Sequence, residues 1–421
     1  ICIGLWKRFT MEMQINDIEP QIMHIDLNSC YAIIEQQANR LIRNKPVGVA
    51  AYTTPRGFII ASSYEAKRQG IKLMRIQEAK QIDSNIIILA PDPEKYFDAH
   101  RRFKAVLEKY TDLVTPKSID EFIVDFQGSE VVRKGQSLVD VGYQIKREIK
   151  EALGEYVTVN IGLAPNRFLA KVAAGLDKPD GLTVIRAEDI HGVYGQLDLI
   201  DLPGINKRYQ ARLNIEGIFT PLDFLDASLH LLKGPVFKSI VGYYWYLRLR
   251  GHEIDAQKFP VRSFGNDFAI RLWTYDREQI ASYIMKLSEK TGRRLRKHNY
   301  QAFGVYLGLA FEDGGWWGKS KKSTAPIYST QEIYLHIMGL FNLVDFPAKC
   351  THVNIAVFNI APASPIQLGL FDGTRLDTKS LAVAADKIND RYGEFTLVPA
   401  KMANMKDVII KRVPFGSVRD I

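Results

Sequence analysis

Few residues of this chain can build disulfide frameworks or zinc sites. The three cysteines, Cys2, Cys30 and Cys350, are widely separated and show neither metal-ligand spacing nor a disulfide pattern, which fits a reducing compartment. The eight histidines show no HExxH motif and no paired arrangement, so a zinc site is not expected. We therefore expect a cytoplasmic protein.

Long apolar runs are also lacking. No segment approaches the roughly 18 uninterrupted apolar residues of a membrane-spanning helix, and the opening ICIGLWKRFT is unlike a cleavable signal peptide. The chain begins with Ile1, and Met11 or Met13 is nearer the expected natural start. Residues 1–19 are therefore expected to be a disordered extension, and no membrane partner is expected.

Positive charge is in excess. The 421 residues include 56 Lys and Arg against 47 Asp and Glu, which gives a formal net charge of +9 and a pI near 9.2. Such a basic chain favours a polyanionic partner, either nucleic acid or an anionic membrane. A chain of this length is also too long for one hydrophobic core, so we expect about two to four domains.

Two folding patterns follow each other along the chain. Up to about residue 185, predicted strands alternate with predicted helices, which indicates an α/β domain with a mixed sheet. The predicted strands are 21–27, 46–52, 57–63, 86–91, 118–126 and 157–166, and the main predicted helices are 28–40, 96–110, 136–152 and 166–175. Residues 186–251 lose the strand pattern and are expected to be helical.

A polar linker, residues 252–261, leads to a second domain. Residues 262–361 show β-α-β-β-α-β order, which is typical of an α+β domain. Residues 362–421 begin as a tail rich in Pro, Gly and Ser and end in an amphipathic helix over 380–392 and a short strand.

Three acidic residues stand at strand ends. Asp26 ends the first predicted strand, and Asp120 and Glu121 begin the strand SIDEFIVDF. Taken alone, an acidic pair before a strand is typical of a solvated loop end. A mixed sheet can bring the three carboxylates to one edge, where they would repel each other unless cations neutralise them. Oxygen ligands favour Mg²⁺, and two such ions about 4 Å apart support phosphoryl transfer.

Five motifs occur in a fixed order. They are IDLNSCYAIIE (25–35), SSYEAKRQGI (62–71), SIDEF (118–122), NIGLAPNRFLAKVAAGLDKPDG (160–181) and DLPGINKRYQARL (201–213). Together they resemble the Y-family translesion DNA polymerases, most closely the bacterial DNA polymerase IV and V types, over about residues 20–415. The resemblance implies a right-hand polymerase of α/β and α+β domains. These would be a palm (20–36 and 83–185), small fingers (37–82), a helical thumb with a helix-hairpin-helix (186–251) and a little finger (262–361).

The resemblance also implies a metal site. Asp26 and Asp120 match the aspartates that bridge two Mg²⁺ ions, and Glu121 matches the ligand of the ion that activates the primer 3′-hydroxyl. The carbonyl of Leu27 would complete the shell of the nucleotide-bound ion. Asp26, Asp120 and Glu121 are thereby the predicted catalytic residues.

Four residues match nucleotide-binding positions of the family. Tyr31 matches the steric gate, whose ring occupies the place of a ribose 2′-hydroxyl, although its spacing fits a buried core aromatic equally well. Tyr64, Lys67 and Lys178 match residues that grip the triphosphate. Lys67 stands where arginine is usual and cannot offer a bidentate fork, so looser triphosphate binding is expected. Asn28 stands where many members carry aspartate, and either Asn28 or Ser29 is expected to cap the helix 28–40.

The motif LPGINK (202–207) resembles one hairpin of a helix-hairpin-helix. Gly204, Asn206 and Lys207 are expected to approach a DNA phosphate through backbone N–H groups. Asn206 replaces the commoner second glycine, and asparagine tolerates positive φ. An ordinary turn between two helices is the alternative.

A second candidate DNA surface is the basic run EKTGRRLRKHNY (289–300). Arg293, Arg294, Arg296 and Lys297 are expected to follow the duplex backbone and to add salt-dependent affinity without sequence preference. Taken alone, such a run is usually a solvated helix face.

The tail contains the peptide QLGLFD (367–372). Gln367, Leu368, Leu370 and Phe371 match the bacterial peptide that binds the sliding clamp, in which apolar anchors dock into a groove. A strand of the last domain is the alternative, and APASPIQ before the peptide disfavours it.

These motifs predict a template-directed DNA polymerase of low fidelity that inserts nucleotides opposite damaged bases. Its expected partners are primer-template DNA, a deoxynucleoside triphosphate and the clamp, and we expect it to be otherwise monomeric. A non-catalytic adaptor that binds DNA and the clamp is the alternative, but it would lack the metal acids. A nucleotidyl cyclase would have no use for the hairpin, the basic helix or the clamp peptide.

Overall fold

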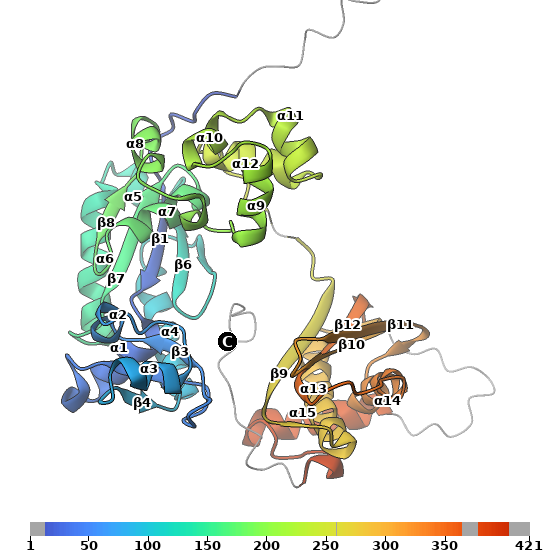
Figure 1. Cartoon of the computed structure of the whole chain (residues 1–421). Coiled ribbons are helices and arrows are strands. Elements are labelled where there is room, and N and C mark those ends of the chain that lie inside the picture. Colours follow the sequence, from blue (N-terminus) through green and yellow to red (C-terminus); the bar gives the residue numbers. More distant parts are fainter. Residues whose placement is uncertain (1–12, 258, 364–377, 404–421) are drawn as a thin grey trace, which may run out of the picture. The chain divides into compact units, whose positions relative to one another are not determined.

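The chain folds into two compact units that divide at residues 257 and 258 (Figure 1). The computed structural model describes residues 13–257, 259–363 and 378–403. Both units combine helices with a β-sheet, as the sequence predicted.

A five-stranded mixed sheet forms the centre of the first unit. Its order is β5-β6-β1-β7-β8, and β1 pairs antiparallel with both β6 and β7. The strands are β1 (Ile22–Leu27), β5 (Val114–Pro116), β6 (Glu121–Asp125), β7 (Val159–Ala164) and β8 (Leu182–Val184). The predicted strands at 21–27, 118–126 and 157–166 are thus confirmed within three residues at either end.

Helices α4 (Pro93–Leu107) and α6 (Leu138–Leu153) belong to the hydrophobic cluster on one face of this sheet. Helix α4 begins where Asp92 accepts a hydrogen bond from the Lys95 N–H and Pro93 takes the first turn. Its apolar side chains repeat at helical spacing and meet Ile25 and Phe122 of the sheet. A short helix, α5 (Glu130–Arg133), lies between α4 and α6 in the chain.

The opposite face of the sheet is covered by α7 (Arg167–Leu176), which Asn166 caps. Gly162 of β7 allows α7 to lie very close. A Cβ at this glycine would stand 2.0 Å from the Ala170 carbonyl oxygen and 2.3 Å from the Ala174 nitrogen. The backbone of α7 therefore nearly touches β7 at Gly162, which pairs with His24 in the middle of β1.

A smaller sheet, of order β3-β2-β4, carries the loops that the sequence assigned to the fingers. Its strands are β2 (Val47–Ala50), β3 (Ile59–Ser62) and β4 (Ile87–Leu89), and its nearby helices are α1 (Cys30–Ala38), α2 (Tyr64–Arg68) and α3 (Ile76–Ile82). Strand β4 pairs with β2, so the predicted boundary between fingers and palm at residue 82 cuts through this sheet.

Helices alone follow β8, as predicted for residues 186–251. They are α8 (Ile190–Tyr194), α9 (Lys207–Ile215), α10 (Pro221–Asp226), α11 (Leu229–Leu231) and α12 (Val241–Leu249). Short 3₁₀ or π turns span Arg40–Ile42, Ala187–Asp189, Leu199–Asp201 and Leu232–Val236.

Part of the predicted disordered extension is ordered. The Asn16 N–H donates to the Arg250 carbonyl at 2.8 Å, and the Asn16 amide donates to the Gly251 carbonyl at 2.9 Å. Ile15 packs against the cluster that contains Trp245. The prediction is therefore wrong for residues 13–19, because backbone hydrogen bonds and one apolar anchor hold this segment against the end of α12. Residues 1–12 lie outside the described part of the chain.

The second unit is a four-stranded antiparallel sheet with helices, of order β11-β10-β12-β9. Its elements in chain order are β9 (Ser263–Thr274), α13 (Arg277–Lys297), β10 (Tyr300–Phe311), β11 (Trp316–Ile327), α14 (Thr330–Phe341) and β12 (Cys350–Pro362). This is the predicted β-α-β-β-α-β order. The buried faces of α13 and α14 share one core with Val305, Leu307 and Ile355 of the sheet.

A further helix, α15 (Thr378–Tyr392), belongs to the same unit. It confirms the predicted helix at 380–392. Met402, in a 3₁₀ turn at Ala400–Met402, is fully buried in the core of this unit, and Phe395 packs beside it. Residues 378–403 are thus an integral part of the second domain rather than a tail.

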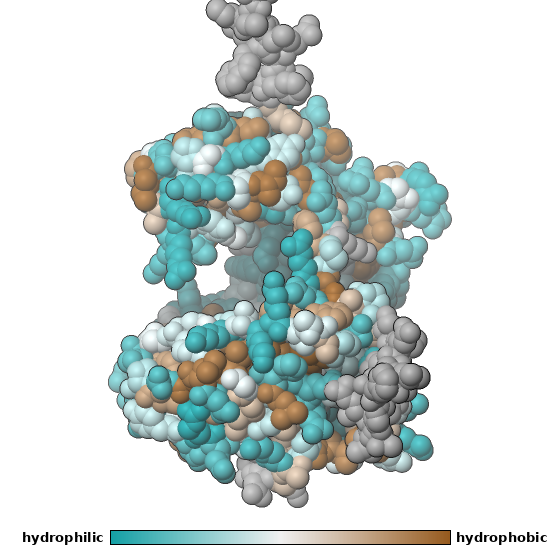
Figure 2. All heavy atoms as spheres, turned by 90° about the vertical axis from the view of Figure 1, so that its right-hand side faces the viewer, coloured by the Kyte–Doolittle hydropathy of each residue, from teal (hydrophilic) through white to brown (hydrophobic). Residues whose placement is uncertain are grey.

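The surface in Figure 2 is mostly hydrophilic, with separate patches of apolar side chains. Among the described residues, the structure contains no helix that is long and apolar enough to cross a membrane.

Candidate active site

The three predicted acids lie at the same end of the five-stranded sheet. Asp26 is directly opposite Glu121 in the antiparallel pairing of β1 with β6. The Leu27 N–H donates to the Asp120 carbonyl at 2.9 Å, which fixes the residue before β6 beside the end of β1. Because antiparallel strands place the end of one beside the start of the other, acids almost 100 residues apart in sequence become neighbours.

Each acid has a different partner. Lys178 forms an ion pair with Asp26. Lys171 of α7 donates to both oxygens of Glu121, at 2.9 and 2.8 Å. The Ser118 hydroxyl donates to Asp120. Two lysines and a hydroxyl thus stabilise three neighbouring carboxylates that would otherwise repel one another.

These surroundings shift the pKa values of the three acids in different directions. Burial raises the pKa of Asp26, and the opposing charge of Lys178 does not cancel this rise. Burial likewise raises the pKa of Asp120, against the hydrogen bond from Ser118. Burial would also raise the pKa of Glu121, but the hydrogen bonds and charge of Lys171 bring it below its ordinary value. Glu121 is therefore the most firmly ionised acid of the three.

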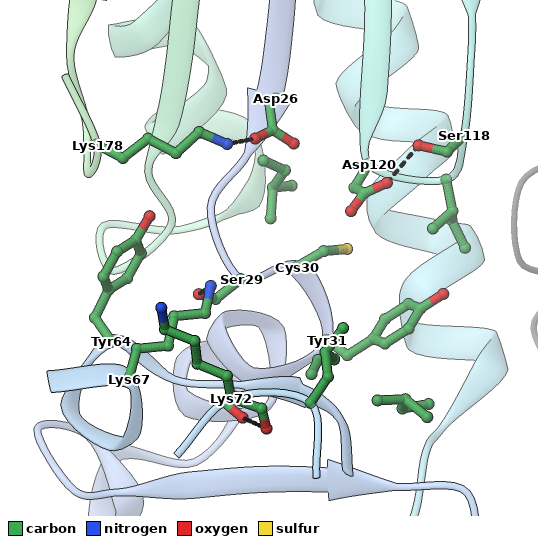
Figure 3. A pocket seen from close by; sticks show the side chains of 16 residues that line it. Asp26, Ser29, Cys30, Tyr31, Tyr64, Lys67, Lys72, Ser118, Asp120 and Lys178 are labelled. Carbon is green, nitrogen blue, oxygen red and sulfur yellow. Dashed lines mark hydrogen bonds and ion pairs between the residues drawn. The ribbon is translucent and has the colours of Figure 1, made fainter. Parts of the chain in front are cut away.

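A pocket of about 690 Å³ opens beside two of the acids. Asp26 and Asp120 point into it from two sides, and Leu27, Tyr31 and Ser118 also line it (Figure 3). The remaining predicted nucleotide-binding residues, Tyr64, Lys67 and Lys178, line the same pocket. The structure therefore brings acids, lysines and aromatic rings from four separate motifs to one cavity.

The cationic side of this pocket comes mainly from the fingers segment. Lys67 lies in α2, and its Nζ donates to the Ser29 hydroxyl at 2.8 Å. The Tyr64 hydroxyl donates to the Asn28 side chain at 3.2 Å, and burial raises the Tyr64 pKa to about 12. Burial lowers the pKa of Lys67, and the nearby Lys178 charge lowers it further. Such a group of lysines is suited to bind a polyphosphate, whose negative charge would offset the repulsion between the lysine ammonium groups.

Asn28 does not cap helix α1. The residue at the cap position is Ser29, whose side chain makes no capping hydrogen bond, while the Asn28 amide donates to the Thr158 hydroxyl at 3.0 Å. Of the two predicted cap residues, Ser29 therefore holds the cap position and Asn28 does not. Asn28 joins β1 to the segment before β7 and accepts the hydrogen bond of the Tyr64 hydroxyl.

Tyr31 lies both in the hydrophobic core and at the wall of the pocket, and its role as a steric gate stays a prediction. Its side chain is 5 % exposed and its ring stacks on Tyr96, with ring centroids 4.5 Å apart. It also lines the pocket. One face of the Tyr31 ring therefore packs in the core. This packing would hold the rest of the side chain in a fixed position at the pocket wall.

Sequence reasoning missed three residues of this site. Lys72 and Ser29 line the pocket, and Lys171 holds Glu121. Lys171 lies within NRFLAKVAAG, so the motif contained it, but no spacing linked it to a strand 50 residues earlier. Lys72 gave no sequence signal.

The donor set fits a hard cation such as Mg²⁺, because the acidic side chains and the Leu27 carbonyl offer only oxygen. In the described part of the chain, no three His, Cys, Asp or Glu side chains are grouped closely enough to hold a metal ion. Glu121 is not among the pocket residues, and both of its oxygens accept from Lys171. The acids are present at one sheet end, but Lys178 pairs with Asp26 and Ser118 donates to Asp120.

The predicted DNA-binding hairpin has one of its two expected backbone features. Gly204 has φ +101°, a conformation that favours glycine, and its Cβ would meet the Trp245 ring at 3.3 Å. Asn206 has φ −105° and caps α9, accepting from the Arg208 and Tyr209 N–H groups. Asn206 therefore replaces glycine as a helix cap, so the expected positive φ is wrong. Lys207 is the first residue of α9 and is exposed.

Two of the four predicted DNA-binding residues on α13 form ion pairs with acidic residues of the same unit. Arg296 donates to both oxygens of Asp386 on α15, at 2.6 and 2.8 Å, and its side chain is 3 % exposed. Arg293 forms an ion pair with Asp390 at 2.8 Å. Arg296 and Arg293 are thus paired with acids of α15, and their contact with DNA phosphates stays a prediction.

The other two predicted residues are placed differently. Arg294 donates to the Gly265 carbonyl at 3.0 Å, and Lys297 is exposed at the end of α13. The clamp peptide residues Gln367, Leu368, Leu370 and Phe371 lie outside the described residues.

Two family models match the chain. Residues 25–175 match the impB/mucB/samB family, and residues 261–370 match the C-terminal domain of the same family. A DNA polymerase IV from Pelotomaculum thermopropionicum is 30 % identical over 400 residues, covering 93 % of this chain and 97 % of the relative. One from Staphylococcus saprophyticus is 29 % identical over 359 residues, covering 84 % and 99 %.

Solved structures agree with these matches. A Y-family DNA polymerase chimera of Dbh and Dpo4 is 26 % identical, with a TM-score of 0.69 over 81 % of this chain and 99 % of the chimera. An insertion ternary complex of Dbh DNA polymerase is 26 % identical with a TM-score of 0.54, covering 82 % of this chain and 99 % of that one. The chain belongs to the Y family of translesion DNA polymerases. Its activity is that of a DNA-directed DNA polymerase.

Proposed function

We propose that this polymerase inserts nucleotides opposite damaged template bases by two-metal nucleotidyl transfer at the end of β1 and β6. The observation that carries the proposal is the pocket shared by Asp26, Asp120, Tyr31, Tyr64, Lys67 and Lys178. An adaptor protein would have no need to gather acids and triphosphate-binding lysines around one cavity.

Asp26, Asp120, Glu121 and the Leu27 carbonyl would hold two Mg²⁺ ions. When bound, these ions would activate the primer 3′-hydroxyl and stabilise the leaving pyrophosphate. The raised pKa values of Asp26 and Asp120 favour this role, because cations would relieve the electrostatic strain of two buried carboxylates.

Lys67 and Lys178 would bind the triphosphate of the incoming nucleotide, and Tyr64 would position it. Lys178 would have to exchange Asp26 for a phosphate group, since the ion pair occupies it. The ring of Tyr31 would exclude a ribose 2′-hydroxyl. These residues bind and orient the nucleotide, and the reaction itself is an attack of the primer oxygen on the α-phosphorus with loss of pyrophosphate.

The proposed partners are primer-template DNA and, through QLGLFD, a bacterial sliding clamp. The likeness to Dbh DNA polymerase, whose structure was solved as an insertion ternary complex, supports the DNA and nucleotide partners. Gly204 and Lys207 at the start of α9 and Lys297 on α13 remain the proposed phosphate contacts. A cytoplasmic location and a monomeric state stay predictions.

The test is Asp120→Asn. Primer extension with Mg²⁺ should fall by at least about 100-fold, the size expected when a key transition-state contact is lost. Binding of primer-template DNA, measured by fluorescence anisotropy, should be unchanged, because the carboxylate serves metal rather than DNA. The exposed Asp112→Asn supplies a matched control and should retain full activity. Activity of Asp120→Asn within about tenfold of the parent would refute the metal assignment.

A further inference from the structure

Helix α7 and the loop after it place two lysines at the acidic end of the sheet. Lys171 lies within α7, and Lys178 lies two residues beyond its end at Leu176. Lys171 contacts both oxygens of Glu121, and Lys178 contacts Asp26. Gly162 makes this possible, because only a residue without Cβ allows α7 to lie so close to β7.

The contact with Lys171 determines where the Glu121 carboxylate lies. Asp26 and Asp120 line the nucleotide pocket, but Glu121 does not. No group of three acidic or metal-ligating side chains is assembled in the described part of the chain. The lysine therefore occupies both oxygens that a metal ion would need.

We infer that Lys171 is a positioning residue that holds Glu121 while no divalent ion is bound and releases it when the ion binds. This rests on the proposed two-metal function. The lysine ammonium and the ion require the same carboxylate oxygens, so they compete. The Lys171 side chain is 42 % exposed on a flexible stem, and it can move into water once it is displaced.

The paired arrangement also explains why the acids tolerate each other. Asp26 and Glu121 are direct cross-strand neighbours, where like charges destabilise a sheet. Two lysines, one on α7 and one just after it, supply one positive charge for each acid. The two lysines thus offset the charges of the neighbouring acids until divalent cations replace them.

Lys171→Gln tests the inference through Mn²⁺ binding. Mn²⁺ is titrated into the protein without DNA or nucleotide, and free ion is measured by electron paramagnetic resonance. The variant should bind Mn²⁺ at least about threefold more tightly than the parent, because a competing positive charge has been removed. Lys171→Met should show the same tightening, and Lys171→Arg should restore the parent affinity.

Lys134→Gln is the matched control. Lys134 is an exposed lysine in an i,i+4 pair with Glu130 of the same unit, and its loss should leave Mn²⁺ affinity unchanged. Thermal unfolding of each variant confirms that it is folded before titration.

An unchanged or weaker Mn²⁺ affinity in folded Lys171→Gln and Lys171→Met would overturn the inference. Asp120→Asn separates this failure from failure of the proposed function. If Asp120→Asn loses Mn²⁺ binding while the Lys171 variants match the parent, only the positioning role is wrong. If Asp120→Asn keeps both Mn²⁺ binding and primer extension, the two-metal site itself is wrong.

Discussion

Tyr31 is held between the hydrophobic core and the proposed nucleotide pocket. Its ring stacks on Tyr96, so the proposed exclusion of a bulkier sugar would depend on this packing. Tyr31→Ala should raise the ratio of ribonucleotide to deoxyribonucleotide insertion by about tenfold or more, a difference of ~1.4 kcal/mol. Single-nucleotide insertion with each substrate measures this ratio.

The ratio is informative even if the variant is less stable. Removing a buried aromatic ring destabilises a core by about 3–5 kcal/mol, but a lower folded fraction reduces both insertions equally. Tyr31→Phe keeps the ring and should preserve sugar selectivity. If Tyr31→Ala has the selectivity of the parent, Tyr31 is a core residue alone.

Asp120 should make the metal-free protein less stable at neutral pH. Its folded-state pKa is raised above the ordinary 3.8, so its contribution to stability is present below that value and is lost as pH rises through the folded pKa. In EDTA at pH 7, Asp120→Asn should therefore unfold at a higher temperature than the parent. The difference should shrink as pH falls toward 4, where the parent carboxyl becomes protonated.

Comparing the two proteins at each pH isolates Asp120 from other titrating groups. His24, whose pKa burial lowers to about 4, titrates in the same range but is present in both. A variant that is less stable than the parent at pH 7 would show that burial does not strain Asp120.

Helices α13 and α15 are joined by a charged pair that is largely hidden from water. Arg296 is 3 % exposed and binds both oxygens of Asp386, so loss of Asp386 leaves a buried charge without its partner. Asp386→Asn should destabilise the second domain by roughly 3 kcal/mol. Thermal unfolding of the whole chain should show a lower transition for this domain.

Asp390→Asn provides the comparison on the same helix. Asp390 is 71 % exposed and pairs with Arg293, and exposed ion pairs contribute at most about 1 kcal/mol. Equal stability of the Asp386→Asn variant and the parent would mean that α15 is not held by this pair.

The sequence predicted most elements because their signals are local. Short apolar runs mark β1, β6 and β7, and apolar residues at helical spacing mark most of α4 and α7. The same local signals placed the acids at strand ends. The antiparallel pairing that brings Asp26 opposite Glu121 required the three-dimensional sheet order, which the sequence could suggest but not specify.

The partners of charged residues could not be predicted. Arg296 pairs with Asp386, 90 residues away in the sequence, and Lys171 pairs with Glu121, 50 residues away. Both contacts depend on how helices pack, and a basic run such as that on α13 is compatible with solvent, DNA or an acidic helix. The Asn206 cap was missed for a related reason, since asparagine suits both positive φ and a helix start.

The proposed clamp peptide should govern processivity rather than chemistry. Leu370 and Phe371 would each contribute roughly 1.5–3 kcal/mol when buried in a clamp groove. The double change Leu370→Ala, Phe371→Ala should therefore abolish clamp pull-down and the stimulation of synthesis by the clamp. Single-nucleotide insertion on a bare primer should be unchanged.

The opposite pattern would reassign the peptide. If the double variant loses thermal stability and basal insertion together, these residues pack within the polymerase. Clamp binding that survives the double change would also exclude QLGLFD as the docking peptide.

Each of the two units has a hydrophobic core of its own. Val305, Leu307 and Ile355 belong to the cluster of the second unit, whereas Ile25 and Phe122 belong to a cluster of the first. Separate family models match the two parts. Recombination between related genes could therefore exchange the second unit while leaving the residues of the first unit's core unchanged.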